Sequence, residues 1–377
     1  MLFSDIIGQE EVKEQLRKQL REERVAHAQL FYGPEGVGKM PMALAFAQAL
    51  LCPHRKGAEA DATCPACRMV ANLQHPDLHF VFPVIGAKDV SDQHLDAWRA
   101  MWKDSPYFDA QRWYRQLSEE GGKSSEGNQQ PQIHVSESEQ ILRKISLTSQ
   151  QGGYKVMIIW QPEQMNVQTA NKLLKILEEP TPRTVFILVS DHAERLLPTI
   201  LSRTQRVEFR PLSVAEMSEA LQTRNALQSA DASRIARQVG GNYVRALRQI
   251  HIDEDAEEFF DLFVQLMRLC YMRKIKDLYL WAETIASWKR ERQKHFLEYC
   301  QRLVRENFVF NFGRPELNSL SQREADFSHN FARFVNERNV MGIMNELNLA
   351  QRDIAQNVSA RMVFFDLAIK MIMLLLK

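Results

Sequence analysis

The sequence has almost no net charge, few cysteines and no long apolar run, and each shortage excludes a class of protein. The 48 basic residues balance 47 acidic ones to leave a net charge of +1, so nucleic acid would have to bind a local basic surface. Five cysteines in 377 residues are too few for a disulfide framework. The apolar run at residues 371–376 is too short to span a membrane, and residues 1–5 lack the basic and apolar regions of a signal peptide. We therefore expect a cytoplasmic globular protein.

The order of the predicted elements divides the chain into three parts. With 45% hydrophobic and 25% charged residues, the 377-residue chain is typical of a globular protein of two or three domains. Within residues 1–210, strand patterns alternate with helical ones, which predicts an α/β domain with a parallel sheet and helices on both faces. The predicted strands are residues 28–32, 78–84, 155–160, 185–189 and 206–209. Residues 211–252 and 253–377 show helical patterns alone, so we expect a small helical domain and an all-helical C-terminal block.

A glycine-rich turn stands between the first predicted strand and an alanine-rich helical pattern. It matches G-x-x-x-x-G-K in the strand–turn–helix context that a phosphate-binding loop requires. The glycines, Gly33, Gly36 and Gly38, allow sharp turns, so that backbone N–H groups and the helix N-terminus can face an anion. Lys39 adds a positive charge for the phosphates. The next position should be Ser or Thr, whose hydroxyl holds Mg²⁺, but it is Met40, which has no hydroxyl.

The carboxylates that a nucleoside triphosphatase needs are also missing. One should hold Mg²⁺ and another should polarise the attacking water, at the end of a central strand beside the loop. The strand at residues 155–160 places Trp160 and Gln161 there, while Glu163 follows a proline and is expected to point elsewhere. Since Met40 also lacks a hydroxyl, we do not expect Mg²⁺-dependent hydrolysis. Whether the loop still binds a nucleotide or a sulfate stays open.

Residues 85–132 differ in composition from their surroundings, and we interpret them as an insertion. Trp98, Trp102 and Trp113 follow a helical pattern and precede a glycine- and serine-rich loop at residues 121–128. Their rings could stack on nucleic-acid bases. Aromatic residues at helical spacing more often pack onto their own domain, and this is the interpretation we favour.

Four segments of the chain carry a specific resemblance. They are residues 3–10 (FSDIIGQE), 27–34 (HAQLFYGP), 171–180 (NKLLKILEEP) and 199–205 (TILSRTQ). In sequence and in order, these segments resemble the clamp-loader family of AAA+ proteins. The last of them is similar to the Ser-Arg-Cys motif of that family.

The resemblance implies three domains and a role for one arginine. It implies an AAA+ P-loop domain over residues 1–210, a helical lid over 211–252 and a helical collar for oligomerisation over 253–377. In the family, the arginine of the Ser-Arg-Cys motif is a finger that reaches the ATP of a neighbouring subunit. The matching residue here is Arg203, followed by Thr204 in place of the cysteine.

The resemblance also indicates which kind of family member this chain is. The degenerate nucleotide site resembles that of a non-hydrolysing member of the family, whose partners are sister subunits and, through the complex, the sliding clamp and primer–template DNA. Ser190 or Asp191 stands near the family's polar sensor, whereas the second-sensor arginine position falls on Val244, with Arg245 one residue late. Two alternatives stay open: a working ATPase that uses Glu163 in place of the lost carboxylates, and an AAA+ adaptor unrelated to replication.

A cysteine cluster lies between the phosphate loop and the second predicted strand. Cys52, Cys64 and Cys67 provide three thiolates at a spacing that suits zinc. The clamp-loader pattern has a fourth cysteine where this chain has Asp61, and zinc also accepts carboxylate oxygen. The resemblance therefore implies a structural zinc site of Cys52, Asp61, Cys64 and Cys67, with His54 as a competing ligand. An abandoned site with free thiols is the alternative.

Overall fold

The computed structural model describes residues 1–86, 88–120, 131–146, 149, 153–179, 181–313, 320, 322–356 and 358–375. The chain forms two compact units, Met1–Leu247 and Arg248–Lys377. The predicted boundaries near residues 210 and 252 stay predictions. The helices that were expected to form a separate lid belong to the first unit instead. The glycine- and serine-rich loop predicted at residues 121–128 lies outside the described residues.

Five parallel strands form the sheet of the first unit, in the order β2-β3-β4-β1-β5. The strands are β1 (Ala28–Tyr32), β2 (Leu78–Val81), β3 (Lys155–Trp160), β4 (Thr184–Ser190) and β5 (Gln205–Glu208). Every residue of β3 and β4 is buried, which explains their near-continuous apolar sequences. The predicted α/β class with a parallel sheet is confirmed.

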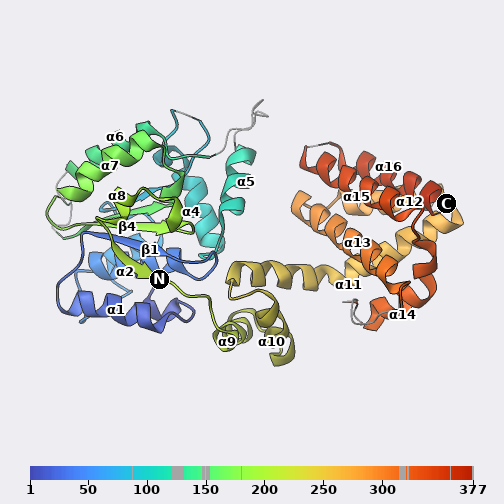
Figure 1. Ribbon diagram of the computed structural model, residues 1–377, viewed down its shortest axis with the longest axis horizontal. Coiled ribbons are helices and arrows are strands. Elements are labelled where there is room, and N and C mark those ends of the chain that lie inside the picture. The colour runs from blue at the N-terminus through green and yellow to red at the C-terminus, as the bar shows by residue number, and fades with distance from the viewer. Residues whose placement is uncertain are drawn as a thin grey trace. The chain divides into compact units, whose positions relative to one another are not determined.

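Helices cover both faces of this sheet (Figure 1). One face packs against α1 (Glu10–Arg21), α2 (Lys39–Leu51), α3 (Pro65–Ala71), α4 (Leu95–Asp104) and α5 (Ala110–Glu120). The other face packs against α6 (Val135–Ser146), α7 (Val167–Glu178) and α8 (Pro198–Leu201). Alternate residues of β3 enter the two cores, because successive side chains of a strand point to opposite faces. Short 3-10 turns are η1 (Phe3–Asp5), η2 (Ser91–His94), η3 (Pro162–Gln164) and η4 (Ala193–Arg195).

The tryptophans of the predicted insertion belong to the core of the first unit. Trp98 stacks on Phe82 with ring centroids 4.3 Å apart and meets Trp113 edge-on at 5.2 Å. Trp98 and Trp113 are fully buried, and the Trp113 indole donates a 2.8 Å hydrogen bond to the carbonyl of Pro83. The favoured interpretation is therefore the one that the structure bears out: these rings pack onto their own domain.

The insertion is also tied to the sheet and to α6 by buried polar contacts. The backbone N–H of Ser91 donates to Glu137 Oε2 at 2.7 Å, and the Ser91 hydroxyl donates to the Phe82 carbonyl at 3.1 Å. Burial raises the pKa of the Glu137 carboxyl, an effect that the N–H of Ser91 opposes. Hydrogen bonds and aromatic packing together fix α4 and α5 on the domain.

Two helices complete the first unit, and helices alone form the described part of the second. α9 (Val214–Asn225) and α10 (Ser229–Gln238) pack against each other. The boundary between the units falls inside α11 (Tyr243–Met272). The second unit continues with α12 (Ile275–Ala286), α13 (Arg290–Phe310), α14 (Gln322–Phe331), η6 (Ala332–Phe334), α15 (Val340–Ala355) and α16 (Ala360–Leu374). The predicted all-helical C-terminal block is confirmed.

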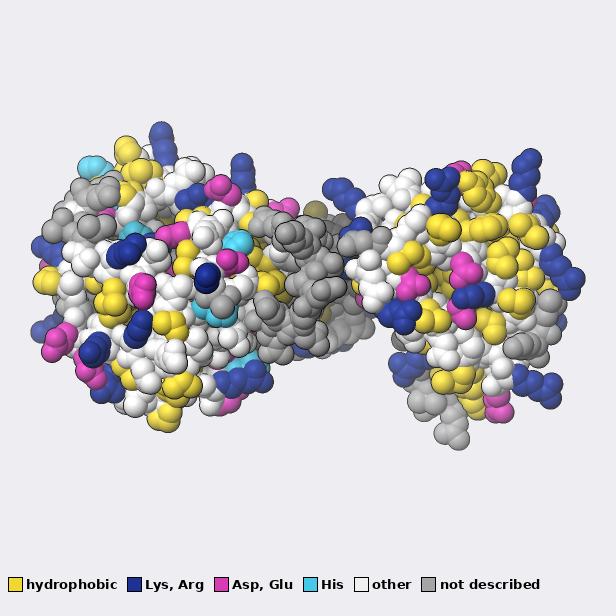
Figure 2. Space-filling view, turned by 90° about the horizontal axis from the view of Figure 1, so that it is seen from above, with side chains coloured by type: hydrophobic (Ala, Val, Ile, Leu, Met, Phe, Trp, Pro, Cys, Tyr) yellow, Lys and Arg dark blue, Asp and Glu magenta, His cyan; other side chains and the backbone are white. Residues whose placement is uncertain are grey.

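The surfaces of both units mix charges of both signs. On the face drawn in Figure 2, basic and acidic side chains are interspersed with hydrophobic ones over each unit, in keeping with a net charge of +1. Among the described residues, no helix is both long and apolar enough to cross a lipid bilayer.

Candidate functional site

The phosphate loop lies between the end of β1 and the start of α2, at the carboxyl edge of the sheet. Gly36 and Gly38 have φ angles of 74° and 93°, in the left-handed region where a side chain is strained. A Cβ at Gly36 would also collide with the side-chain amide of Asn242. Lys39 is the first residue of α2, so the strand, turn and helix that a phosphate loop needs are all present.

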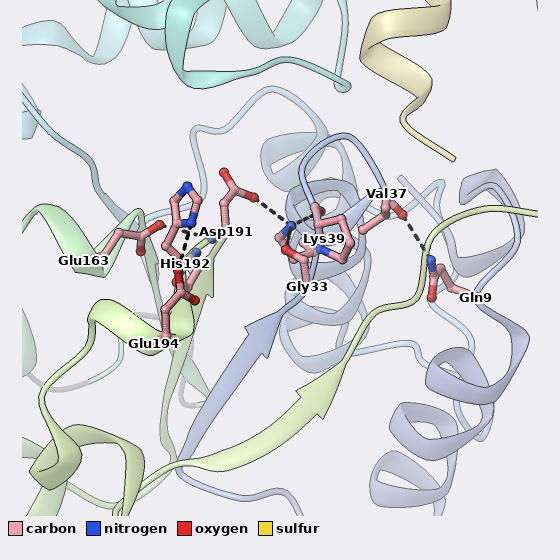
Figure 3. A network of polar contacts seen from close by, with 10 residues as sticks. Gln9, Gly33, Val37, Lys39, Glu163, Asp191, His192 and Glu194 are labelled. Atoms are coloured by element: carbon pink, nitrogen blue, oxygen red, sulfur yellow. Dashed lines mark hydrogen bonds and ion pairs between the residues drawn. The ribbon is translucent and has the colours of Figure 1, made fainter. Parts of the chain in front are cut away.

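The ammonium group of Lys39 is held by groups of its own chain (Figure 3). It donates to the carbonyl of Gly33 at 2.7 Å and also to the carbonyl of Pro34. It forms an ion pair with Asp191 Oδ1 at 2.7 Å, at the end of β4. The lysine side chain is only 4% exposed. A phosphate would therefore have to compete with the half-buried carboxylate of Asp191 for this charge.

Glu163 supports this arrangement through the backbone of Asp191. Its Oε1 accepts a 3.1 Å hydrogen bond from the backbone N–H of Asp191. Burial raises the pKa of the Glu163 carboxyl, which the hydrogen bonds it accepts oppose. The described residues that line the cavity beside the loop do not include Glu163. Its carboxylate is therefore used to hold the chain after β4.

The cavity beside the loop is small, with a volume of about 30 Å³. Its lining includes Tyr107, Phe108, Trp160 and Val244. The Tyr107 ring lies 3.3 Å from where a Cβ of Gly38 would be. Segments of the insertion and of α11 therefore occupy the space over the loop.

Tyr107 and Tyr243 hold this cover in place. The Tyr107 hydroxyl accepts a 3.1 Å hydrogen bond from the N–H of Ile7, and burial raises the pKa of its phenol. The Tyr107 and Tyr243 rings meet edge-on at 4.9 Å. The N–H of Tyr243 donates to the carbonyl of Gly36 at 3.0 Å, so the first turn of α11 contacts the phosphate loop directly.

The side chains at the two positions where an ATPase has carboxylates contact the insertion. Trp160 packs against Trp98 at 5.2 Å and against Phe108 at 5.4 Å. The Gln161 side-chain oxygen accepts a 2.6 Å hydrogen bond from the Tyr114 hydroxyl. An aromatic ring and a neutral amide make these contacts where a metal-binding pair would have needed solvent and charge.

Arg203 follows α8, two residues beyond its end, and is held by side-chain and backbone acceptors. Its Nε donates a 2.7 Å hydrogen bond to Glu178 Oε1, and its Nη2 lies 2.6 Å from the same oxygen in an ion pair. Its Nη1 donates to the carbonyl of Thr199 at 3.0 Å. The arginine side chain is 35% exposed, so the guanidinium is oriented and still reachable from outside.

The three cysteine sulfurs of the predicted zinc site come together. Cys52 ends α2, Cys64 caps α3, and Cys67 lies in its first turn. Their sulfurs lie within 4.8 Å of one another, with Cys52 and Cys64 3.9 Å apart. The described metal-ligand cluster contains these cysteines alone. The carboxylate of Asp61 instead accepts from the Thr63 hydroxyl at 3.0 Å, and Asp61 contributes its backbone N–H to Cys52 Sγ.

Sequence reasoning missed the residues that close the loop. From the sequence, Asp191 is only a candidate for the family's polar sensor, and no motif indicates that Tyr107 or Asn242 contacts the loop. Asp191 is 152 residues from Lys39 along the chain. The one available signal was Asp191 directly after an apolar strand, at the edge where the loop also lies.

Comparisons with known proteins find one family for the first unit. The family described as "DNA polymerase III, delta subunit" matches residues 8–213. The DNA polymerase III subunit delta' of Bacillus subtilis is 27% identical over 266 residues, which are 71% of this chain and 66% of that protein. The subunit delta' of Pseudomonas aeruginosa is 34% identical over 178 residues, 47% of this chain and 41% of that protein. The matches thus span less than two thirds of these relatives.

A further relative and two solved structures are also similar. The DNA polymerase III subunit tau of Bacillus subtilis is 28% identical over 56% of this chain and 29% of that protein. The RuvB Holliday junction branch migration motor of Thermotoga maritima is 17% identical, covers 69% of this chain and 65% of its own, and has a TM-score of 0.38. A gamma-subunit-related protein of DNA polymerase III from the same organism is 14% identical. The match covers 94% of this chain and 97% of that protein, with a TM-score of 0.33.

We predict that Asp191→Asn destabilises the protein by about 3 kcal/mol, because it leaves the buried ammonium of Lys39 without its counter-charge. Chemical denaturation followed by circular dichroism measures the change. Glu194→Gln is the matched control, since Glu194 is an exposed acid three residues away and should change stability by less than about 0.5 kcal/mol. In the double variant Lys39→Met/Asp191→Asn, part of the lost stability should return. If Asp191→Asn kept the stability of the wild type, the Lys39–Asp191 ion pair would not be stabilising the fold.

Proposed function

This chain belongs to the delta-prime branch of the DNA polymerase III clamp-loader family, and we propose that it is a non-hydrolysing subunit that completes a neighbouring subunit's ATP site with Arg203. Its partners would be the other loader subunits, of the tau/gamma and delta types. Through that complex it would act on the sliding clamp and on primer–template DNA. The near-neutral net charge favours DNA contacts that are shared with those partners.

The observation that carries the non-hydrolysing part of the proposal is the filled space over the phosphate loop. A P-loop ATPase needs room for three phosphates, a lysine free to reach them, and ligands for Mg²⁺. Here the cavity is about 30 Å³ and Lys39 is paired with Asp191. Met40, Trp160 and Gln161 supply neither a hydroxyl nor a carboxylate to a metal.

The observations that support the second part concern Arg203. An arginine finger must carry a guanidinium on a surface that a neighbour can reach, and it stabilises the charge that develops on the transferred phosphoryl group. Arg203 is partly exposed and oriented by Glu178 and Thr199. It also stands in the segment that resembles the family's finger motif.

The alternative is a subunit of the tau/gamma type that hydrolyses ATP itself, which a relative such as the subunit tau of Bacillus subtilis makes worth testing. It would need Glu163 to act as the catalytic carboxylate. Against it, Glu163 is half-buried, accepts a hydrogen bond from the backbone of Asp191 and stands apart from the described lining of the cavity. These contacts favour the non-hydrolysing proposal.

We further propose that Cys52, Cys64 and Cys67 hold a structural zinc ion. Zn–S bonds of about 2.3 Å place the sulfurs of a tetrahedral site roughly 3.8 Å apart. The 3.9 Å between Cys52 and Cys64 and the 4.8 Å limit for the whole cluster fit such a site. The ion would join the end of α2 to the start of α3 and would leave the Asp61 carboxylate outside its ligand set.

For zinc, we expect about one ion per chain in purified full-length protein, measured by elemental analysis. Cys64→Ser should lower the zinc content, because it removes one of three thiolates. Asp61→Asn should leave the content unchanged, since its carboxylate accepts from Thr63. Equal, negligible zinc in the wild type and in Cys64→Ser would show that the cluster is a set of free thiols.

For the finger, we expect Arg203→Ala to lower the ATPase rate of the reconstituted clamp-loader complex at least about ten-fold, since such fingers contribute roughly 10³–10⁵ in rate at their own site. Arg203→Lys should not restore the rate, because an ammonium lacks the guanidinium fork. Arg206→Ala is the control on an exposed arginine three residues away. Assembly, followed by size-exclusion chromatography, should be unchanged. An unaltered rate in Arg203→Ala would rule out the finger.

A further inference from the structure

We infer that Glu178 is a positioning residue, which holds the guanidinium of Arg203 in the orientation that a neighbouring subunit's ATP requires. This inference rests on the proposed function of Arg203. Glu178 belongs to the Leu-Glu-Glu-Pro stretch at the end of the 171–180 segment. The proline of that stretch lies outside the described residues.

The contact joins two elements that are far apart in the sequence. Glu178 is the last residue of α7, and Arg203 comes just after α8. One carboxylate oxygen of Glu178 accepts a 2.7 Å hydrogen bond from Nε and forms an ion pair with Nη2 at 2.6 Å. The Thr199 carbonyl accepts from Nη1 at 3.0 Å. Acceptors on two separate elements thus fix the plane of the guanidinium.

The neighbouring residues make Glu178 a defined support. Leu177 is buried in the core between α7 and the sheet, so the end of α7 is anchored. Ile200 of α8 is buried in the same core. Glu178 itself is 48% exposed at the side chain, and it reaches Arg203 across the surface between two anchored helices. The two side chains therefore meet because the core fixes both of their backbones.

The contact is better suited to orientation than to fold stability. Ion pairs between exposed side chains contribute little to stability, because solvent screens them and two flexible side chains must be ordered. An arginine that reaches a neighbour's phosphate must be ordered as well, and ordering it beforehand lowers the entropy lost at the catalytic step. Glu178 binds Nε and Nη2 through one oxygen, and Arg203 stays 35% exposed. That geometry orients the guanidinium without enclosing it.

The test is the steady-state ATPase of the reconstituted clamp-loader complex with clamp and primed DNA. We expect Glu178→Ala to lower kcat about ten-fold, because a misplaced catalytic group loses rate steeply, while KM for ATP stays within about two-fold. Glu178→Gln should keep most of the rate, since its amide oxygen can accept the same hydrogen bond from Nε. Glu179→Ala is the matched control, an exposed acid in the same stretch. Glu178→Ala added to Arg203→Ala should cause no further loss.

The outcomes separate this inference from the proposed function. If Arg203→Ala slows the complex and Glu178→Ala does not, the finger stands and the positioning role falls. A faster complex in Glu178→Ala would make Glu178 a restraint on the finger and would also overturn the inference. An unchanged rate in Arg203→Ala would remove the proposed function on which the inference rests. Equal thermal unfolding of wild type and Glu178→Ala is expected, since the pair is a surface contact.

Discussion

The buried ammonium of Lys39 must be neutralised for the first unit to be stable, and the group that neutralises it determines what the phosphate loop can do. In a nucleotide site, phosphate oxygens share that task. In this chain Asp191 and the carbonyls of Gly33 and Pro34 perform it without a ligand. The loop is therefore complete as a structural element, and its glycines serve the close approach of Asn242 and Tyr107.

Trp160 and Gln161 offer no carboxylate to a metal, and the same two side chains anchor the insertion. Trp160 occupies a position where a carboxylate was expected, and its ring joins the aromatic cluster around Trp98. Gln161 occupies the other position and accepts from Tyr114. Replacing Trp160 and Gln161 by Asp and Glu would place charge against buried rings. The proposed contribution of the chain to catalysis then depends on Arg203, whose guanidinium is partly exposed and oriented.

Much of this structure could be predicted from the sequence, because the evidence for it is local. Apolar runs and a glycine-rich turn mark the parallel sheet and the phosphate loop, and the spacing of Cys52, Cys64 and Cys67 marks their cluster. The contacts that fill the site could not be predicted, since Asp191 and Asn242 reach the loop from distant parts of the chain. The direction in which the Asp61 carboxylate points also depends on a loop conformation that spacing does not fix.

We propose that the chain does not use its own phosphate loop as a nucleotide site, and calorimetric titration of the purified full-length chain with ATP and Mg²⁺ measures whether it does. Because Lys39 is paired internally and the cavity over the loop holds about 30 Å³, we expect no saturable binding and no turnover of ATP. Saturable binding, or turnover that Lys39→Ala abolishes, would contradict the account.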